Sequence, residues 1–117
     1  MSNYTVDFYT MEDGFQPVAA YLTTLDEKML AKTLRDIDML ETNGPALREP
    51  QSKALEPNLF KLRTKVGSNI SRVLYFFIVG KRIILTNGFI KKQDQTPESE
   101  KARARRYRDD YFRRYGK

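Results

Sequence analysis

The sequence lacks two residue types that are common in catalytic and metal sites. It contains no cysteine, so disulfides and thiolate metal ligands are excluded. It also contains no histidine, which removes the usual general base near neutral pH and the commonest nitrogen ligand of zinc. Any catalysis must therefore use lysine, arginine, tyrosine, aspartate or glutamate, and we expect neither a metal nor another cofactor.

Long hydrophobic runs are also missing. No apolar stretch approaches the roughly 20 residues needed to cross a bilayer. The first residues, Met1 to Thr5, show no basic segment followed by an apolar one, as a secretion signal would. We therefore expect a cytoplasmic protein without membrane contact. Its 117 residues, 40% hydrophobic and 31% charged, predict one globular domain over 1–117.

Positive charge is concentrated in the C-terminal half. Residues 1–52 contain 4 basic and 9 acidic residues, whereas residues 53–90 contain 7 basic residues and a single acid. Residues 91–117 contain 10 basic and 5 acidic residues, and the whole chain carries +6. This asymmetry indicates a nucleic acid or another polyanion as partner, with a basic but merely solvated surface as the alternative.

Hydrophobic periodicity in the first half predicts a strand followed by two helices. Residues 4–9 alternate and are rich in β-branched and aromatic side chains, which is typical of a strand. Residues 15–42 predict a helical hairpin, with Pro17 in the first turn of its first helix. A capping box from Thr24 to Glu27 is expected to begin the second helix. The apolar stripe of that helix comprises Leu30, Leu34, Ile37 and Leu40.

The second half predicts strands and a final helix. Residues 47–57 contain two prolines and suggest a loop. Strands are expected over 59–66, 70–79 and 82–90, joined by turns short enough for antiparallel neighbours. The last helix should have Thr96 as its N-cap and Pro97 as its first residue. Its apolar stripe comprises Ala104, Tyr107, Tyr111 and Tyr115. The predicted fold is α+β, with an N-terminal strand and helical hairpin packed on an antiparallel-rich sheet in the order β-α-α-β-β-β-α.

Basic residues on the predicted strands form the candidate site. Lys61, Arg63 and Lys65 alternate along one strand, so they point to one face, which must be wet or meet an anion. Arg72 interrupts an apolar strand, where a guanidinium needs a defined partner: Glu56 or an acid of the N-terminal half, or a phosphate. A solvated sheet surface remains the alternative for the lysines. Acids are scarce near these cations, which argues against a magnesium site.

Three segments carry a family resemblance. They are Leu-Phe-Lys-Leu-Arg at 59–63, Ser-Arg-Val-Leu-Tyr at 71–75, and Asn-Gly-Phe-Ile-Lys-Lys at 87–92, which Thr96-Pro97 follows. In this order they resemble the HigB-like branch of the RelE/ParE toxin superfamily, which includes many phage-derived proteins. The likeness runs from the first strand to the last helix, and the RelE-like fold has the element order predicted above.

The resemblance implies a type II toxin that inhibits translation as a ribosome-dependent mRNA endonuclease. In such toxins the 2′-hydroxyl of the RNA attacks the adjacent phosphorus without a metal, leaving a 2′,3′-cyclic phosphate and a 5′-hydroxyl. The catalytic residues implied by position are Lys61, Arg72, Lys91 and Lys92. The expected RNA contacts are Lys53, Arg63, Lys65, Tyr107 and Tyr111, although both tyrosines also belong to the packed stripe of the last helix.

The resemblance also implies partners and leaves alternatives open. The expected partners are a helix-turn-helix antitoxin of the HigA type and mRNA on the ribosome, with operator DNA reached only through the antitoxin. ParE-like members share the fold but inhibit DNA gyrase, and a non-catalytic RNA-binding module would carry similar charge. ParE-like members lack the basic cluster, so its presence here favours the nuclease.

Overall fold

In the part of the chain that the computed structural model describes, residues 4–91 and 96–116, a five-stranded sheet is flanked by three α-helices. The predicted α+β class is confirmed. The elements, in chain order, are β1 (Thr5–Phe8), α1 (Pro17–Leu22), α2 (Glu27–Asn43), a short 3-10 turn (Gly44–Ala46), β2 (Ser52–Glu56), β3 (Leu59–Val66), β4 (Asn69–Ile78), β5 (Arg82–Lys91) and α3 (Glu98–Tyr115).

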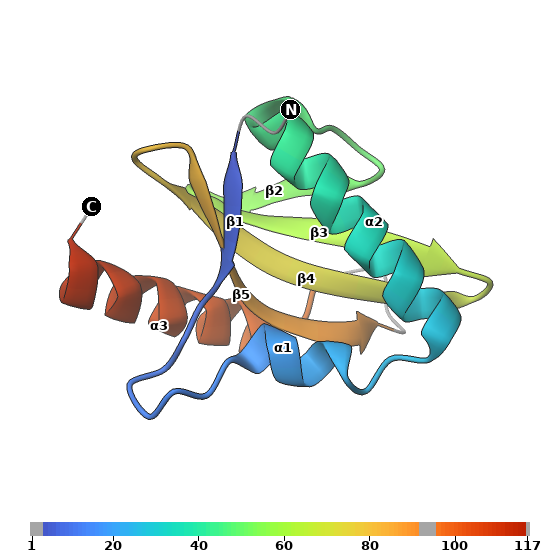
Figure 1. Cartoon of the computed structure of the whole chain (residues 1–117), viewed down its shortest axis with the longest axis horizontal. Helices are drawn as coiled ribbons and strands as arrows, with labels where there is room; N and C mark the ends of the chain where they lie inside the picture. The colour runs from blue at the N-terminus through green and yellow to red at the C-terminus, as the bar shows by residue number, and fades with distance from the viewer. Residues whose placement is uncertain (1–3, 92–95, 117) are drawn as a thin grey trace.

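The sheet has the strand order β1-β5-β4-β3-β2 (Figure 1). Strands β2 to β5 form a meander of antiparallel neighbours, as the short turns predicted for β3, β4 and β5. Strand β1 pairs in parallel with β5, so the N-terminal strand lies beside the last one. The most apolar strand, β4, occupies the centre, where both of its faces can be buried.

The two faces of the sheet are covered differently. Helices α1 and α2 pack on one face, over a core that includes Leu40, Leu62 and Val73. Helix α3 packs on the opposite face, where Tyr111 contacts Phe76 and the fully buried Ala104 lies in a cluster with Leu59 and Leu74. Among the described residues, no helix is both long and apolar enough to cross a membrane.

One strand was missed by the sequence prediction. Residues 47–57 were expected to form a loop, but Ser52–Glu56 forms β2 and pairs with β3 at the sheet edge. The segment is short, contains Lys53 and Glu56, and is followed by Pro57, features that edge strands share with loops. The order is therefore β-α-α-β-β-β-β-α rather than β-α-α-β-β-β-α.

The start and the buried stripe of α2 also differ from the prediction. The predicted capping box is wrong, because Thr24 donates to the Tyr21 carbonyl oxygen. The N-cap is Asp26, whose carboxylate accepts from the Met29 amide. Leu34 is 43% exposed, because the helix turns the polar residues Thr33 and Asp36 toward the sheet together with the predicted Ile37. The Asp36 carboxylate accepts a hydrogen bond from Thr64 of β3, which fixes this rotation of the helix.

The final helix begins one residue later than expected. Pro97 is its N-cap, with ψ at 139° in the extended region, and Glu98 is its first residue. Thr96 was therefore wrongly assigned as the N-cap. The stripe is buried as predicted at Ala104 and Tyr111, but Tyr115 at its end is 63% exposed.

A β-bulge in β5 changes which side chains face α3. Asn87 pairs with Leu74, but Tyr75 pairs with Leu85, so Thr86 is an extra residue without a register partner. Its hydroxyl donates to the Leu74 carbonyl oxygen at 3.1 Å. Residues two apart in a regular strand point to the same face. Here Leu85, before the bulge, faces α1 and α2, whereas Asn87, after it, faces the side of α3.

Candidate functional site

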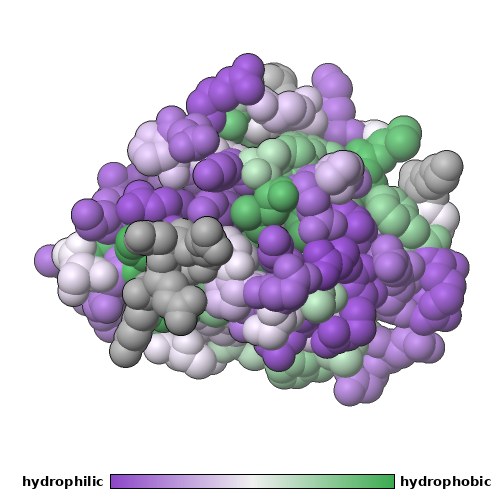
Figure 2. All heavy atoms as spheres, turned by 180° about the vertical axis from the view of Figure 1, so that it is seen from behind, coloured by the Kyte–Doolittle hydropathy of each residue, from purple (hydrophilic) through white to green (hydrophobic). Residues whose placement is uncertain are grey.

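Five basic residues from three strands share one face of the sheet. Lys53 of β2 is the register partner of Lys61 of β3, and Arg63 of β3 is the partner of Arg72 of β4. Lys65 follows Arg63 by two residues and therefore points to the same side. These five residues, called the cationic face below, lie on the side of the sheet where α3 packs but beyond the first turns of that helix. Figure 2 shows the molecule from behind, where hydrophilic side chains dominate the surface.

Lys61 lies at the centre of the cationic face. Its side chain is buried, with only 9% of the residue exposed. Burial lowers its pKa, and the charges of Arg72, Lys53 and Arg63 lower the pKa further, against a smaller opposing effect of Glu49. A larger fraction of this amine is therefore neutral near physiological pH than of an ordinary lysine.

Arg72 is even more deeply placed, with 4% of the residue exposed. Glu56, one of the acids considered as its partner, accepts from Arg105 at 2.7 Å and lies 3.9 Å from Arg108. The register partner of Lys61 is Leu74, two residues from Arg72 on β4, so both side chains point to the same side of the sheet. Arg72 and Lys61 thus lie on the same face of the sheet, on neighbouring strands.

The other members of the cationic face have few acidic neighbours. Across residues 4–91 and 96–116, none of Lys53, Lys61, Arg63 and Lys65 lies within 4 Å of a carboxylate oxygen. Lys53 and Lys65 are exposed and Arg63 is half-buried. Such a group of like charges at one place favours an anionic ligand.

The two remaining lysines expected at the site are only partly placed. Lys91 ends β5, where its backbone pairs with Ile70, but its side chain is not described. Lys92 lies outside the described residues. Their roles stay predictions.

The two tyrosines expected to contact RNA pack beneath α3. Tyr107 stacks on Tyr9, with ring centroids 4.7 Å apart, and Tyr111 meets Phe76 edge-on. The structure does not bring either ring to the cationic face. Both tyrosines instead belong to the core on this side of the sheet.

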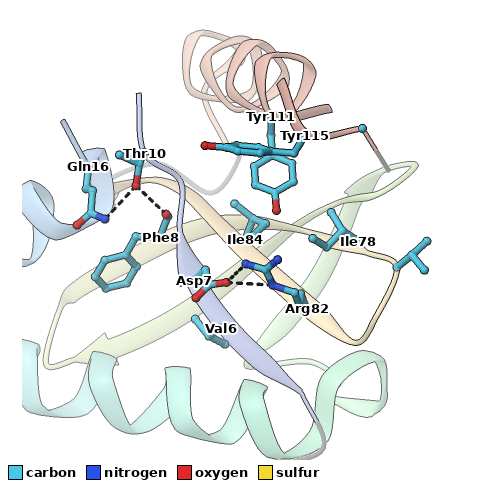
Figure 3. Close-up of a pocket in the computed structure, with 12 residues that line it drawn as sticks. Val6, Asp7, Phe8, Thr10, Gln16, Ile78, Arg82, Ile84, Tyr111 and Tyr115 are labelled. Carbon is cyan, nitrogen blue, oxygen red and sulfur yellow. Dashed lines mark hydrogen bonds and ion pairs between the residues drawn. The ribbon is translucent and has the colours of Figure 1, made fainter. Parts of the chain in front are cut away.

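Tyr111 and Tyr115 also overhang a cavity of about 770 Å³ at the β1 edge of the sheet (Figure 3). Their rings lie above Ile84, and the Arg82 guanidinium in the cavity meets the Asp7 carboxylate. Because Asp7 offsets the charge of Arg82, this cavity is a weaker anion site than the cationic face.

The arginines of α3 are mostly matched by carboxylates. Arg105 pairs with Glu56 and Glu98, and Arg114 pairs with Asp110 at 2.8 Å. Arg108 donates to the backbone carbonyl oxygens of Pro57 and Asn58 at 3.0 Å. These side chains hold α3 against the sheet rather than presenting free positive charge.

The Asn87-Gly88-Phe89 segment has a structural role at each residue. Asn87 donates to the Glu100 carboxylate at 2.9 Å, which ties β5 to the start of α3. A Cβ on Gly88 would lie 2.3 Å from the Tyr21 ring, so glycine lets α1 approach the sheet. Phe89 pairs with Arg72 and, because of the bulge, points to the cationic face. The sequence prediction missed Phe89, because only the bulge at Thr86 aims it there.

The side chains of the cationic face have a chemistry that suits a phosphate ligand. Guanidinium groups can hold phosphate oxygens and stabilise added negative charge on phosphorus. A lysine with a lowered pKa can accept a proton near neutral pH. Among the described residues, no group of three acidic side chains could hold a metal ion.

The fold and its cationic face are compatible with the RelE-like class of small toxins. A comparison with protein families supports this class. The sequence model of the family described as "Phage derived protein Gp49-like (DUF891)" matches residues 20–109. The chain therefore belongs to this phage-derived family, which is RelE- and toxin-like. No curated protein matches the chain significantly.

Proposed function

We propose that this chain is the toxin of a type II toxin–antitoxin pair and that it cleaves mRNA on the ribosome, as a HigB-like toxin does. The observation that carries the proposal is the convergence of Lys61 and Arg72 with three further cations on one face of the sheet. Membership of a toxin-like family supports the same class. The expected partner is a helix-turn-helix antitoxin of the HigA type, through which operator DNA is reached, and the expected compartment is the cytoplasm.

In the proposed reaction the substrate provides its own nucleophile. The neutral amine of Lys61 takes the proton of the 2′-hydroxyl, and the 2′-oxygen forms a bond to the adjacent phosphorus. Arg72 holds the non-bridging oxygens and stabilises the negative charge of the phosphorane. The bond from phosphorus to the 5′-oxygen then breaks, and that oxygen takes a proton from solvent. The products are a 2′,3′-cyclic phosphate and a 5′-hydroxyl.

The remaining cations have the simpler task of holding the RNA backbone. Lys53 and Lys65 are exposed on either side of the central pair, and Arg63 lies between them. Contacts from such side chains to phosphates give affinity without reading the base sequence. Positioning by several phosphate contacts is what converts a flexible strand into a reactive geometry.

The test is to add the purified chain to a translation extract and to map the 5′ ends of the mRNA. We expect new ends in phase with codons, which ligate to an adapter only after a kinase has phosphorylated them, because cleavage leaves 5′-hydroxyls. Breakage of DNA by gyrase without mRNA cleavage would contradict the proposal and indicate a ParE-like activity. Binding of RNA without cleavage would indicate a non-catalytic RNA-binding module.

A further inference from the structure

Phe89 is an aromatic residue set among cations. It is half-buried and lies on β5 as the register partner of Arg72 on β4, with Arg63 as the next partner on β3. A row of two guanidinium groups and one phenyl ring therefore crosses three neighbouring strands, which are about 4.8 Å apart. The phenyl ring borders the core under the start of α3, where its neighbours are Leu74 and Ala104.

The bulge at Thr86 is what gives the ring this position. Without the extra residue, Phe89 would point to the opposite face, where α1 packs and where Tyr21 already covers Gly88. Bulges often re-aim a side chain beside a functional site. Phe89 contributes only at the margin of the core and remains partly exposed, so packing alone does not account for its placement among cations.

We infer that Phe89 is the surface on which a nucleobase of single-stranded RNA stacks while Arg72 and Lys61 hold the adjacent phosphate. The inference rests on the proposed function and adds to it the position of the base. Every base has a flat π face, and stacking on an aromatic side chain is a common way of holding single-stranded RNA. Phe89 and Arg72 lie side by side on neighbouring strands, so a base stacked on the ring would have its sugar–phosphate beside the guanidinium.

The chain contains no tryptophan, which allows a direct test. Phe89→Trp places the single tryptophan of the variant on the cationic face and retains a flat ring. Titration with a six-nucleotide RNA whose 2′-hydroxyls are methylated, so that it resists cleavage, should quench the tryptophan emission. The same oligomer without bases should bind through its phosphates but leave the emission unchanged. A matched control is Tyr115→Trp, whose exposed ring lies at the far end of α3 and should not respond to either oligomer.

A second variant separates stacking from packing. Phe89→Leu keeps an apolar side chain but removes the ring, so affinity for the RNA should fall about 5- to 100-fold while affinity for the abasic oligomer stays unchanged. Cleavage in the translation extract should fall in parallel, and Phe89→Trp should retain it. Thermal melting of both variants reports whether the fold is intact.

The outcomes distinguish failure of this inference from failure of the proposed function. Binding of the RNA without quenching, or normal cleavage by Phe89→Leu, would overturn the stacking surface and leave the nuclease standing. Quenching by an RNA that the wild-type chain never cleaves would support the stacking surface and contradict the nuclease. Failure of both oligomers to bind at low salt would overturn the stacking surface together with the RNA site.

Discussion

The cationic face and helix α3 are both rich in basic residues, but their surroundings differ. On α3, Arg105 and Arg114 each pair with a carboxylate at less than 3 Å. On the cationic face, Lys53 and Lys65 have no carboxylate oxygen within 4 Å among the described residues. The same residue type therefore serves two purposes. Paired cations fix the helix on the sheet, whereas Lys53 and Lys65, which have no carboxylate nearby in the described part of the chain, suit the binding of an anion.

The largest effects should come from the two buried cations of the cationic face. Lys61→Ala and Arg72→Ala should each lower mRNA cleavage by about 100- to 1,000-fold, because each removes a group that the proposed reaction uses in its transition state. Arg106→Ala, on the exposed surface of α3, is the control and should leave cleavage unchanged. Full activity of Lys61→Ala or Arg72→Ala, with a normal circular-dichroism melt, would contradict their catalytic roles.

The opposite pattern is expected for the packing network of α3. The Tyr9 hydroxyl donates to the Asp110 carboxylate, and burial together with this bond raises the pKa of Tyr9 to about 12. Tyr9→Phe should lower the free energy of unfolding by about 1.5–3 kcal/mol, as expected for a hydrogen bond to a charged group. Cleavage at 25 °C should be retained. Tyr107→Phe keeps the stack on Tyr9 and should leave stability unchanged in the same urea titration.

The acid sensitivity of this network has a definite sign. The bond from Tyr9, followed by that from Arg114, lowers the pKa of Asp110. The stabilisation is therefore present above the ordinary carboxyl pKa and is lost as the pH falls through the lowered one. In Tyr9→Phe that loss should be smaller, so the stabilities of variant and wild type should converge at low pH. A difference in the free energy of unfolding between variant and wild type that stays constant as the pH falls would contradict this role of the Tyr9–Asp110 bond.

The buried charge of Lys61 should lower the free energy of unfolding, whereas the hydrogen bond of Tyr9 raises it. Its pKa is lowered by burial and by Arg72, so the folded chain releases this proton at lower pH than the unfolded chain does. Between the lowered pKa and the ordinary 10.5 the unfolded chain binds more protons, and stability rises with pH. Lys61→Met should therefore raise the free energy of unfolding at pH 7 by about 0.5–2 kcal/mol while abolishing cleavage. The gain should shrink toward pH 10.5, and a destabilised Lys61→Met at pH 7 would contradict the electrostatic cost.

Sequence periodicity predicted the features that depend on local alternation. The strands β3, β4 and β5 and the shared direction of Lys61, Arg63 and Lys65 follow from the two-residue repeat of a strand. The family resemblance identified Arg72 by position, and strand pairing places it beside them. What the sequence could not supply is long-range: the pairing of β2 with β3 and the rotation of α2.

The bulge at Thr86 shows why a side chain can be missed even when its strand is predicted correctly. An alternating pattern assigns Leu85 and Phe89 to the same face, but the extra residue separates them. The same limit applies to Tyr107 and Tyr111, whose spacing on α3 fits both packing and binding. Only their contacts with Tyr9 and Phe76 place them in the core.

The smallest expected effect compares a single cation from each region. Lys53→Gln and Arg105→Gln remove the same charge, but Arg105 is paired with Glu56 and Lys53 has no carboxylate within 4 Å among the described residues. If only the cationic face contacts phosphates, Lys53→Gln should reduce the slope of log affinity against log salt by about 0.7 for single-stranded RNA. Arg105→Gln should leave that slope unchanged and should instead lower the melting temperature. Equal changes in slope would mean that net charge, rather than its placement on the sheet, governs binding.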